Sequence, residues 1–245
     1  MEHVPTALAF AFGLITLLAV AIFCRAARYS GRTLAVLAAW LGLQGLVALR
    51  GFYTVANSLP PRPLALVAPP VLLMGLLFGT ARGRRYLDGL HLPTLTLLHL
   101  VRIPVELVLY GLYVHQAVPE LMTFAGRNWD ILSGLSAPVV YYLVLRQKTL
   151  GAGWLLGWNF VALGLLLNIV TNALLAAPTP FQRFAFEQPN VAILHFPFNW
   201  LPAVVVPLVL LAHLAAIRQL WGAKRRASAG AAGRGSNFSG AELVS

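Results

Sequence analysis

The sequence predicts an all-α membrane protein, a polytopic bundle of seven transmembrane helices with its N-terminus outside and its C-terminus in the cytoplasm. Three observations predict this fold class. Only 10% of the 245 residues are charged and 59% are hydrophobic, whereas about a quarter of the residues of a soluble domain are charged. The apolar residues form runs close to the ~20 residues that a helix needs to cross a bilayer. The basic residues lie between these runs, which is the pattern of membrane topology.

The charge and cysteine content exclude several classes of protein. A net charge of +11 could indicate nucleic-acid binding in a soluble protein, but here the basic residues flank apolar runs, so no nucleic-acid partner is expected. Cys24 is the single cysteine, which excludes an internal disulfide and any CxxC motif. The N-terminal apolar run lacks a basic leader and outlasts a signal-peptide core, so it is expected to remain as the first span.

Each expected span follows from its own stretch of sequence. The first is the continuous apolar run after the N-terminus, and the second is apolar apart from Gln44 and Arg50. The third is the shortest, and Pro69-Pro70 should kink it because proline removes a helical hydrogen bond. The fourth carries charged residues within its apolar run, whereas the last three are mostly apolar and have charged residues only at their ends. The spans are expected at residues 5–24, 33–57, 63–81, 94–116, 129–146, 153–177 and 197–219.

The orientation follows from the positions of lysine and arginine. Three, three, two and five basic residues follow the first, third, fifth and seventh spans, thirteen of the 18 in the chain, while the intervening loops hold one each. Basic loops stay in the cytoplasm, which places the N-terminus outside. Residues 1–222 are therefore expected to form the transmembrane domain. Residues 223–245, which are small, polar and basic, are expected to form a disordered cytoplasmic tail.

The outward loops combine charged residues with prolines, amides and aromatics, as in AVPELMTFAGRNWD and APTPFQRFAFEQPN. Acids and arginines recur together in both, which indicates that the loops fold back as an ordered cap over the helix ends. Salt bridges at the membrane interface are the simpler alternative, and the sequence leaves both open. The charged residues expected in this outer cap are Glu120, Arg127, Asp130, Arg183 and Glu187.

The fourth span carries polar and aromatic residues on one face, because spacings of three and four share a side of a helix. This stripe consists of His99, Arg102, Glu106, Tyr110 and Tyr113. Arg102 and Glu106 are four residues apart and could neutralise each other. Pro104 lies between them and leaves the carbonyl of Leu100 without its helical partner. Since a charge at mid-membrane costs several kcal/mol unless it is paired or hydrated, the stripe predicts an intramembrane polar cavity, with a structural interhelical ion pair as the alternative.

Other spans supply polar side chains for the same cavity. Asn168 and Asn172 share a face of the sixth span. His213 of the seventh span is expected at a depth similar to that of His99, since His213 lies five residues before Arg218 and His99 five residues after Thr94. Arg50 is expected inside the second span toward its outer side, where it would need a carboxylate partner.

The positions of the lysines and histidines decide which cofactor and metal sites can be expected. The only lysines, Lys148 and Lys224, lie at the cytoplasmic border, which excludes a retinal protein. No two histidines have the HxxxH spacing of seven-span zinc hydrolases, so no metal site is expected. Two histidines at matching depth are how membrane b-type cytochromes hold haem. No cofactor is expected, and haem b on His99 and His213 is the alternative. Hydrogen bonding of each histidine inside the bundle explains their presence more simply.

Four segments of the chain together resemble a known family. They are LHLVRIPVELVLY, VPELMTFAGRNWDILSG, NIVTNALLAAPTPFQRFAFEQPNVAILHFPFNWLP and LPPRP. They are similar to an uncharacterised family of bacterial polytopic inner-membrane proteins, over roughly residues 50–220. The resemblance implies a multi-pass protein of the bacterial cytoplasmic (inner) membrane, and it implies no activity.

The sequence favours a protein that binds or transports a small solute or ion reached from the outside, with proton coupling as one form. One alternative is a haem- or quinone-linked membrane redox protein. The other is a non-enzymatic assembly or sensor subunit whose outer cap docks a membrane-protein partner or a second copy. No motif names a reaction, so an enzymatic role is not favoured. The expected partners are the lipid bilayer and the small solute or ion.

Overall fold

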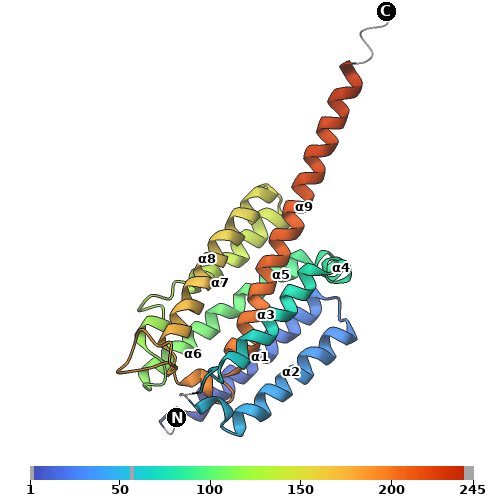
Figure 1. Cartoon of the computed structure of the whole chain (residues 1–245). Coiled ribbons are helices and arrows are strands. Elements are labelled where there is room, and N and C mark those ends of the chain that lie inside the picture. The colour runs from blue at the N-terminus through green and yellow to red at the C-terminus, as the bar shows by residue number, and fades with distance from the viewer. Residues whose placement is uncertain (1–2, 56–57, 240–245) are drawn as a thin grey trace, which may run out of the picture.

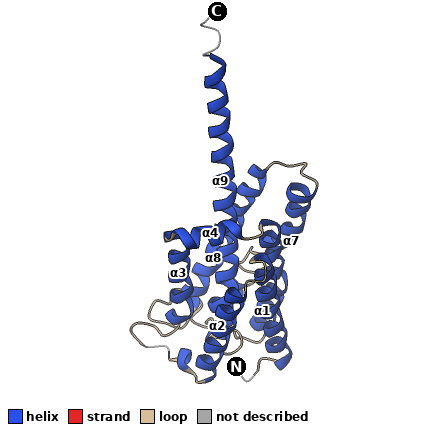
Figure 2. Ribbon diagram, turned by 90° about the vertical axis from the view of Figure 1, so that its right-hand side faces the viewer, coloured by secondary structure: helices blue, strands red, loops and turns tan. Residues whose placement is uncertain are grey.

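The computed structural model describes residues 3–55 and 58–239, and in this part of the chain every regular element is helical. The helices pack into a bundle, and the end of the last helix extends out of it (Figures 1 and 2). The α-helices are α1 (Thr6–Ala26), α2 (Gly31–Leu49), α3 (Leu64–Gly79), α4 (Ala81–Gly89), α5 (Leu92–Leu98), α6 (Arg102–Val114), α7 (Ile131–Val140), α8 (Ala152–Ala176) and α9 (Val206–Ser239). The shorter elements are η1 (Phe52–Thr54), η2 (His99–Val101), η3 (Glu120–Met122), η4 (Tyr141–Arg146), η5 (Ala192–Leu194) and η6 (Leu201–Val205), of which η4 and η6 are π-helices and the others 3-10 helices.

Five helical stretches are long and apolar enough to cross a membrane. Their most apolar windows have a mean hydropathy between 1.6 and 2.6. They are α1, α2, the continuous stretch Leu92–Val114 formed by α5, η2 and α6, α8, and the stretch Leu201–Arg226. The protein therefore has the helices of a multi-pass membrane protein.

The two other expected spans are helical but shorter. α3 ends at Gly79, and the chain then bends by 97° into α4. Thr80 has extended backbone angles, and its side chain accepts a hydrogen bond from the amide of Gly83, so it caps α4 and separates it from α3. α7 and η4 together form the shorter apolar helix Ile131–Arg146.

The second span ends earlier than expected. α2 stops at Leu49, Arg50 is its C-cap, and Gly51 follows in the left-handed conformation with φ of +68°. Glycine adopts this conformation at no steric cost, so the helix terminates although the sequence beyond it is apolar. The side chain of Arg50 is exposed. The prediction that Arg50 lies buried inside a span is therefore wrong.

The last helix continues where the sequence predicts a disordered tail. α9 runs without a break to Ser239, and its final turns extend beyond the bundle (Figure 1). The protruding segment is rich in glycine, alanine and serine, and isolated helices are marginal in water without packing partners. Disorder of the tail therefore stays a prediction.

The fourth span is one continuous helical stretch with a local change of pitch. The three residues of η2 form a 3-10 turn directly before α6. Pro104 has no amide hydrogen and its ring presses against the preceding turn, which accounts for the tighter turn at this point. α7 approaches the same region closely, because a Cβ added to Gly134 would lie 2.9 Å from Cγ1 and 3.2 Å from the amide nitrogen of Ile103.

The bundle has a buried centre and a sparsely covered side. In the Leu92–Val114 and Leu201–Arg226 stretches, 61% of the most apolar window is buried, compared with 22% in α2. The residues of α2 that are buried are Leu41, Gln44, Gly45 and Ala48, all in its second half. α2 and α3 therefore form one flank of the bundle, and the first half of α2 is left uncovered (Figure 1).

Candidate functional site

The structure collects charged and polar side chains from four helices inside the bundle. We call this set the polar cluster, and every member of it is buried. It consists of His99, Arg102, Glu106, Asn128, Asp130, Asn159 and His213. η2 and α6 supply the first three, the loop before α7 supplies Asn128 and Asp130, and α8 and α9 supply one residue each.

Arg102 joins the two halves of the cluster. Its Nη2 donates a hydrogen bond to Nε2 of His213 at 2.9 Å. Its Nη1 lies 2.9 Å from Oδ1 of Asp130, an ion pair whose angles fall outside hydrogen-bond geometry. Arg102 was expected to pair with Glu106, but its ion pair in the structure is with Asp130. The reason is that the start of α7 brings the carboxyl group of Asp130 within reach of the guanidinium.

The hydrogen bonds of His213 define its tautomer. A guanidinium can only donate, so Nε2 of His213 accepts from Arg102, and the ring proton resides on Nδ1. Nδ1 then donates to Oδ1 of Asn159 at 2.9 Å. The amide of Asn159 is oriented by its own Nδ2, which donates to the carbonyl of Leu155 at 2.8 Å. His213 is therefore held neutral with both nitrogens in use.

His99 packs against the same ring. The His99 and His213 rings stack with centroids 4.0 Å apart and planes 20° from parallel. Trp158 meets His99 edge-on at 5.3 Å, and its indole donates to Oγ of Ser136 at 2.9 Å. The two histidines were expected at a similar depth, and in the structure their rings are in direct contact.

This arrangement does not fit a haem. Axial histidines point a nitrogen lone pair at the iron from opposite faces of the macrocycle. Here the two rings stack face to face at 4.0 Å, and neither nitrogen of His213 has a lone pair free for a metal. Among the described residues, no group of three or more histidine, cysteine, aspartate or glutamate side chains could hold a metal ion.

Glu106 is attached through Asn128 to the loop between α6 and α7. Nδ2 of Asn128 donates to Oε1 of Glu106 and, at 3.0 Å, to the carbonyl of Met122. Oδ1 of Asn128 accepts from the backbone amide of Asp130 at 3.1 Å. A single fully buried amide therefore holds the Glu106 carboxyl group and the backbone of Asp130 in place relative to each other.

The cluster carries more polar atoms than it pairs. Within the part of the chain that the structure describes, the unpartnered buried atoms here include Nδ1 of His99, Nε of Arg102, Oε2 of Glu106 and Oγ of Ser133, one turn after Asp130. The cluster also holds one guanidinium against two carboxyl groups, while His213 is neutral. With both carboxyl groups ionised, the cluster would be one positive charge short of balance, which is costly in a buried setting.

The remaining residues of the expected cavity lie elsewhere. Tyr110 is partly exposed and stacks on Phe124 at 5.1 Å, and Tyr113 uses its carbonyl to accept a hydrogen bond from Gln188. Asn168 donates to the carbonyl of Arg127, and Asn172 donates back to Asn168. These four residues therefore support the loops after α6 and α8 and do not join the polar cluster. Arg50, exposed at the end of α2, is also outside it.

The loop after α6 and the loop after α8, which were expected to face outward, are joined by backbone and amide hydrogen bonds. The amides of Val191 and Ala192 donate to the carbonyl of Ala117, and Gln188 donates to the carbonyls of Tyr113 and Val118. Four of the five charged residues expected in the cap are exposed, with no ion pair among the described residues: Glu120, Arg127, Arg183 and Glu187. Asp130 differs, because it points inward to Arg102.

The sequence did not connect three members of the site with the fourth span: Asn128 and Asn159 were not singled out, and Asp130 was expected in the outer cap. Asn128 and Asp130 stand in a loop, where no helical periodicity relates them to the fourth span. Asn159 could have been found, because it lies seven residues after the start of α8, at a depth similar to that of His213. Trp158, its neighbour, offered no signal beyond an aromatic residue in an apolar helix.

One comparison identifies a family. The family model described as Domain of unknown function (DUF8737) matches residues 59–221, which include the whole polar cluster. No curated protein and no solved structure matches the chain.

Proposed function

We propose that this chain, which belongs to the family described as Domain of unknown function (DUF8737), binds and relays protons through its polar cluster. The description of the family names no activity, so the proposal depends on the site alone. In this proposal the protein lies in the bacterial inner membrane and takes part in proton-coupled movement of a small ion or solute. The observation that carries the proposal is the charge count of the cluster, one guanidinium and two carboxyl groups sealed from water. A proton shared by the carboxyl groups would restore neutrality.

The proposed topology has seven spans. α3 is the third and the α7–η4 stretch is the fifth, with α4 lying along the cytoplasmic surface. Sixteen residues, as in Ile131–Arg146, rise about 24 Å as a helix, somewhat less than the ~30 Å hydrocarbon core. The basic residues that flank these helices support the cytoplasmic placement of α4 and of the loop after η4.

Cysteine labelling tests this topology. In a Cys24→Ser background, an impermeant maleimide added to intact cells is expected to label Glu187→Cys in the outer loop and to spare Thr149→Cys, which lies in the proposed cytoplasmic loop. Both positions are exposed, so both should react after permeabilisation. The reverse pattern in intact cells would invert the topology, and labelling of both would show that the two loops lie on the same outer side.

The order of groups in the cluster supports a relay that starts at the outer side. Asp130 directly follows the exposed Trp129 at the edge of the outer loop. The carboxyl groups of Asp130 and Glu106 take up the proton in this proposal, because Arg102 stays charged and the amide of Asn159 has no proton to pass on. Arg102 lies between Asp130 and His213, and Asn159 orients His213 deeper in the bundle. Stacked rings fill the space beside this path. The packed cluster suits a proton better than a larger solute, which would need an open cavity.

Replacing Glu106 by glutamine is expected to abolish proton binding without unfolding the protein. Glutamine keeps the Oε1 atom that accepts from Asn128, but it cannot take up a proton. In proteoliposomes with an imposed membrane potential, proton influx should fall by about 100-fold, the lower end of what a positioned proton-transfer group contributes. The pH-dependent infrared spectrum should lose a carboxylic-acid signal that the unmodified protein shows.

Glu187→Gln is the matched control, because Glu187 is an exposed acid of the outer loop. It should conduct like the unmodified protein. The proposal is overturned if unmodified proteoliposomes take up protons no faster than protein-free vesicles, or if the Glu106→Gln protein keeps both the flux and the infrared signal.

A further inference from the structure

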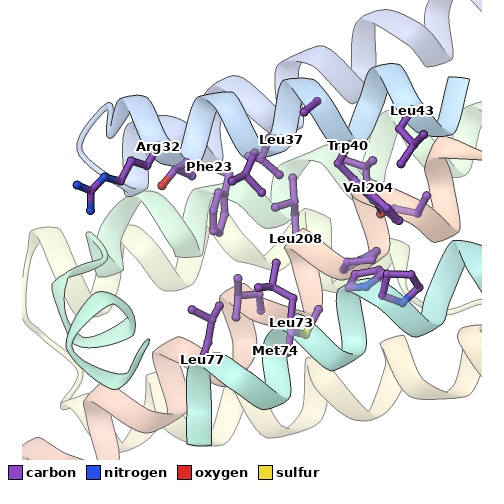
Figure 3. A pocket seen from close by; sticks show the side chains of 18 of the residues that line it. Phe23, Arg32, Leu37, Trp40, Leu43, Leu73, Met74, Leu77, Val204 and Leu208 are labelled. Carbon is purple, nitrogen blue, oxygen red and sulfur yellow. Dashed lines mark hydrogen bonds between the residues drawn. The ribbon is translucent and has the colours of Figure 1, made fainter. Parts of the chain in front are cut away.

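A second site lies on the flank of the bundle. A groove of about 560 Å³ runs between α2 and α3, with α9 and η6 behind it (Figure 3). This volume falls within the roughly 300–1,000 Å³ of ligand pockets. Its walls are almost entirely apolar, and they include Leu37, Leu43, Leu73, Leu77 and Leu208. The groove shares no residue with the polar cluster.

The groove exists because α2 is attached to its neighbours at both ends. At the outer end, Pro207 lacks an amide hydrogen, so the carbonyl of Ala203 has no helical donor. The indole of Trp40 donates to that carbonyl at 2.9 Å, and the indole of Trp200 donates to the carbonyl of Leu41 at 3.1 Å. These bonds hold the outer half of α2 against η6.

At the other end, Oγ1 of Thr33 and the hydroxyl of Tyr86 lie 3.1 Å apart and form a hydrogen bond between α2 and α4. Between these two attachments no backbone or side-chain hydrogen bond ties α2 to α3 or α9 among the described residues. The helices are therefore spaced apart there, and apolar side chains line the space.

The polar groups of the groove gather at one end. Arg32, Thr33 and Tyr86 line this end, which the topology places at the cytoplasmic surface. Arg32 is exposed, and within the described residues it forms no ion pair with a carboxylate. It also stands in the first turn of α2, where the helix dipole adds positive potential. This end of the groove therefore attracts an anion.

We propose that the groove binds an anionic glycerophospholipid of the cytoplasmic leaflet, with one acyl chain between α2 and α3 and the phosphate at Arg32. The groove has a charged end and an apolar length, which are the two chemical parts of such a lipid. Apolar surface along the chain and one arginine at the phosphate both stabilise the complex.

The length of the groove agrees with one leaflet. Arg32 and Leu43 are eleven residues apart on α2 and mark its two ends (Figure 3). Eleven residues of α-helix rise about 16 Å, close to half of the ~30 Å hydrocarbon core. An acyl chain whose phosphate lies at Arg32 would therefore end near Leu43, at the bilayer midplane.

The groove is open to the lipid phase. Of its lining residues, Val36, Leu43 and Leu73 are about half exposed. The same helices are spans in the proposed topology, so the opening faces hydrocarbon and not water. A lipid can enter sideways without unfolding any element.

Lipid binding to the purified protein tests the proposal. Native mass spectrometry in detergent, with phosphatidylglycerol and phosphatidylethanolamine added in equal amounts, is expected to show preferential binding of phosphatidylglycerol. Arg32→Gln should reduce that preference about fivefold, the effect of one basic residue near an anionic surface. Leu73→Trp should fill the groove and remove the bound lipid of either kind.

Two matched variants control for surface charge and bulk. Arg82→Gln removes an exposed arginine of α4 outside the groove, and Leu76→Trp enlarges an exposed leucine of α3 that does not line it. Both should bind lipid as the unmodified protein does. Equal binding of the two lipids to the unmodified protein overturns the proposal. A dimer that Leu73→Trp dissociates would overturn it in favour of a second copy seated in the groove, and loss of lipid preference in Arg82→Gln would show a diffuse surface effect.

Discussion

Replacing Arg102 by methionine is expected to lower the free energy of unfolding by about 3–5 kcal/mol, the cost of leaving buried charges without their partner. Arg102 is 3% exposed and contacts both Asp130 and His213. Methionine fills a similar volume but provides no positive charge, so two carboxyl groups would remain in the bundle with no cation. Thermal unfolding in detergent, followed by the fluorescence of the six tryptophans, measures the loss.

A second substitution separates charge from packing. Adding Asp130→Asn to Arg102→Met removes one of the stranded carboxylates, so the double variant should lose less stability than the sum of the two single variants. Arg85→Met on the exposed face of α4 is the matched control and should change stability by no more than about 0.5 kcal/mol. Additive losses in the double variant would contradict a direct Arg102–Asp130 interaction.

Replacing Gly134 by valine is expected to destabilise the protein by about 1–3 kcal/mol through overpacking. An added Cβ would lie 2.9 Å from Cγ1 of Ile103 and 3.3 Å from Cβ of Arg102. α7 would have to move away from α6, which would also withdraw Asp130 from Arg102. The change should therefore lower both the unfolding temperature and the proton flux in proteoliposomes.

Gly164→Val is the control for this prediction. Gly164 lies in the middle of α8, and an added Cβ there would meet no atom within 4 Å. Valine at this position should leave stability unchanged or raise it slightly, because glycine is the poorer helix former. If both variants lose the same stability, the loss at Gly134 comes from valine in a helix and not from contact between α7 and α6.

Part of the site could be predicted because it depends on local periodicity. His99, Arg102 and Glu106 were expected on one buried face of a helix, and all three are buried. The contact between His99 and His213 agrees with a simple count of residues from the ends of two spans. Helical periodicity predicts such contacts when both partners lie in regular helices, because a rise of 1.5 Å per residue converts sequence position into depth.

Helical periodicity does not predict where a side chain points when its residue belongs to a loop or a helix end. Asp130 was expected in the outer cap, but its side chain turns inward to Arg102 because α7 begins beside the expected fourth span. Arg50 was expected inside the membrane, but Gly51 ends α2 just after it. In both cases a short-range turn decided the direction of a charged side chain.

Hydropathy and helical period are properties of each segment alone. They were therefore enough to predict that the chain is helical, that several segments are long and apolar enough to cross a membrane, and that one of these segments carries charged groups. Which buried side chains contact one another depends on the tertiary structure. The pairing of Arg102 with Asp130, the hydrogen bonds from Arg102 through His213 to Asn159, and the groove between α2 and α3 all depend on how separate helices approach one another. That approach depends on single close-packing residues such as Gly134 and on carbonyls freed by proline, which no local pattern reveals.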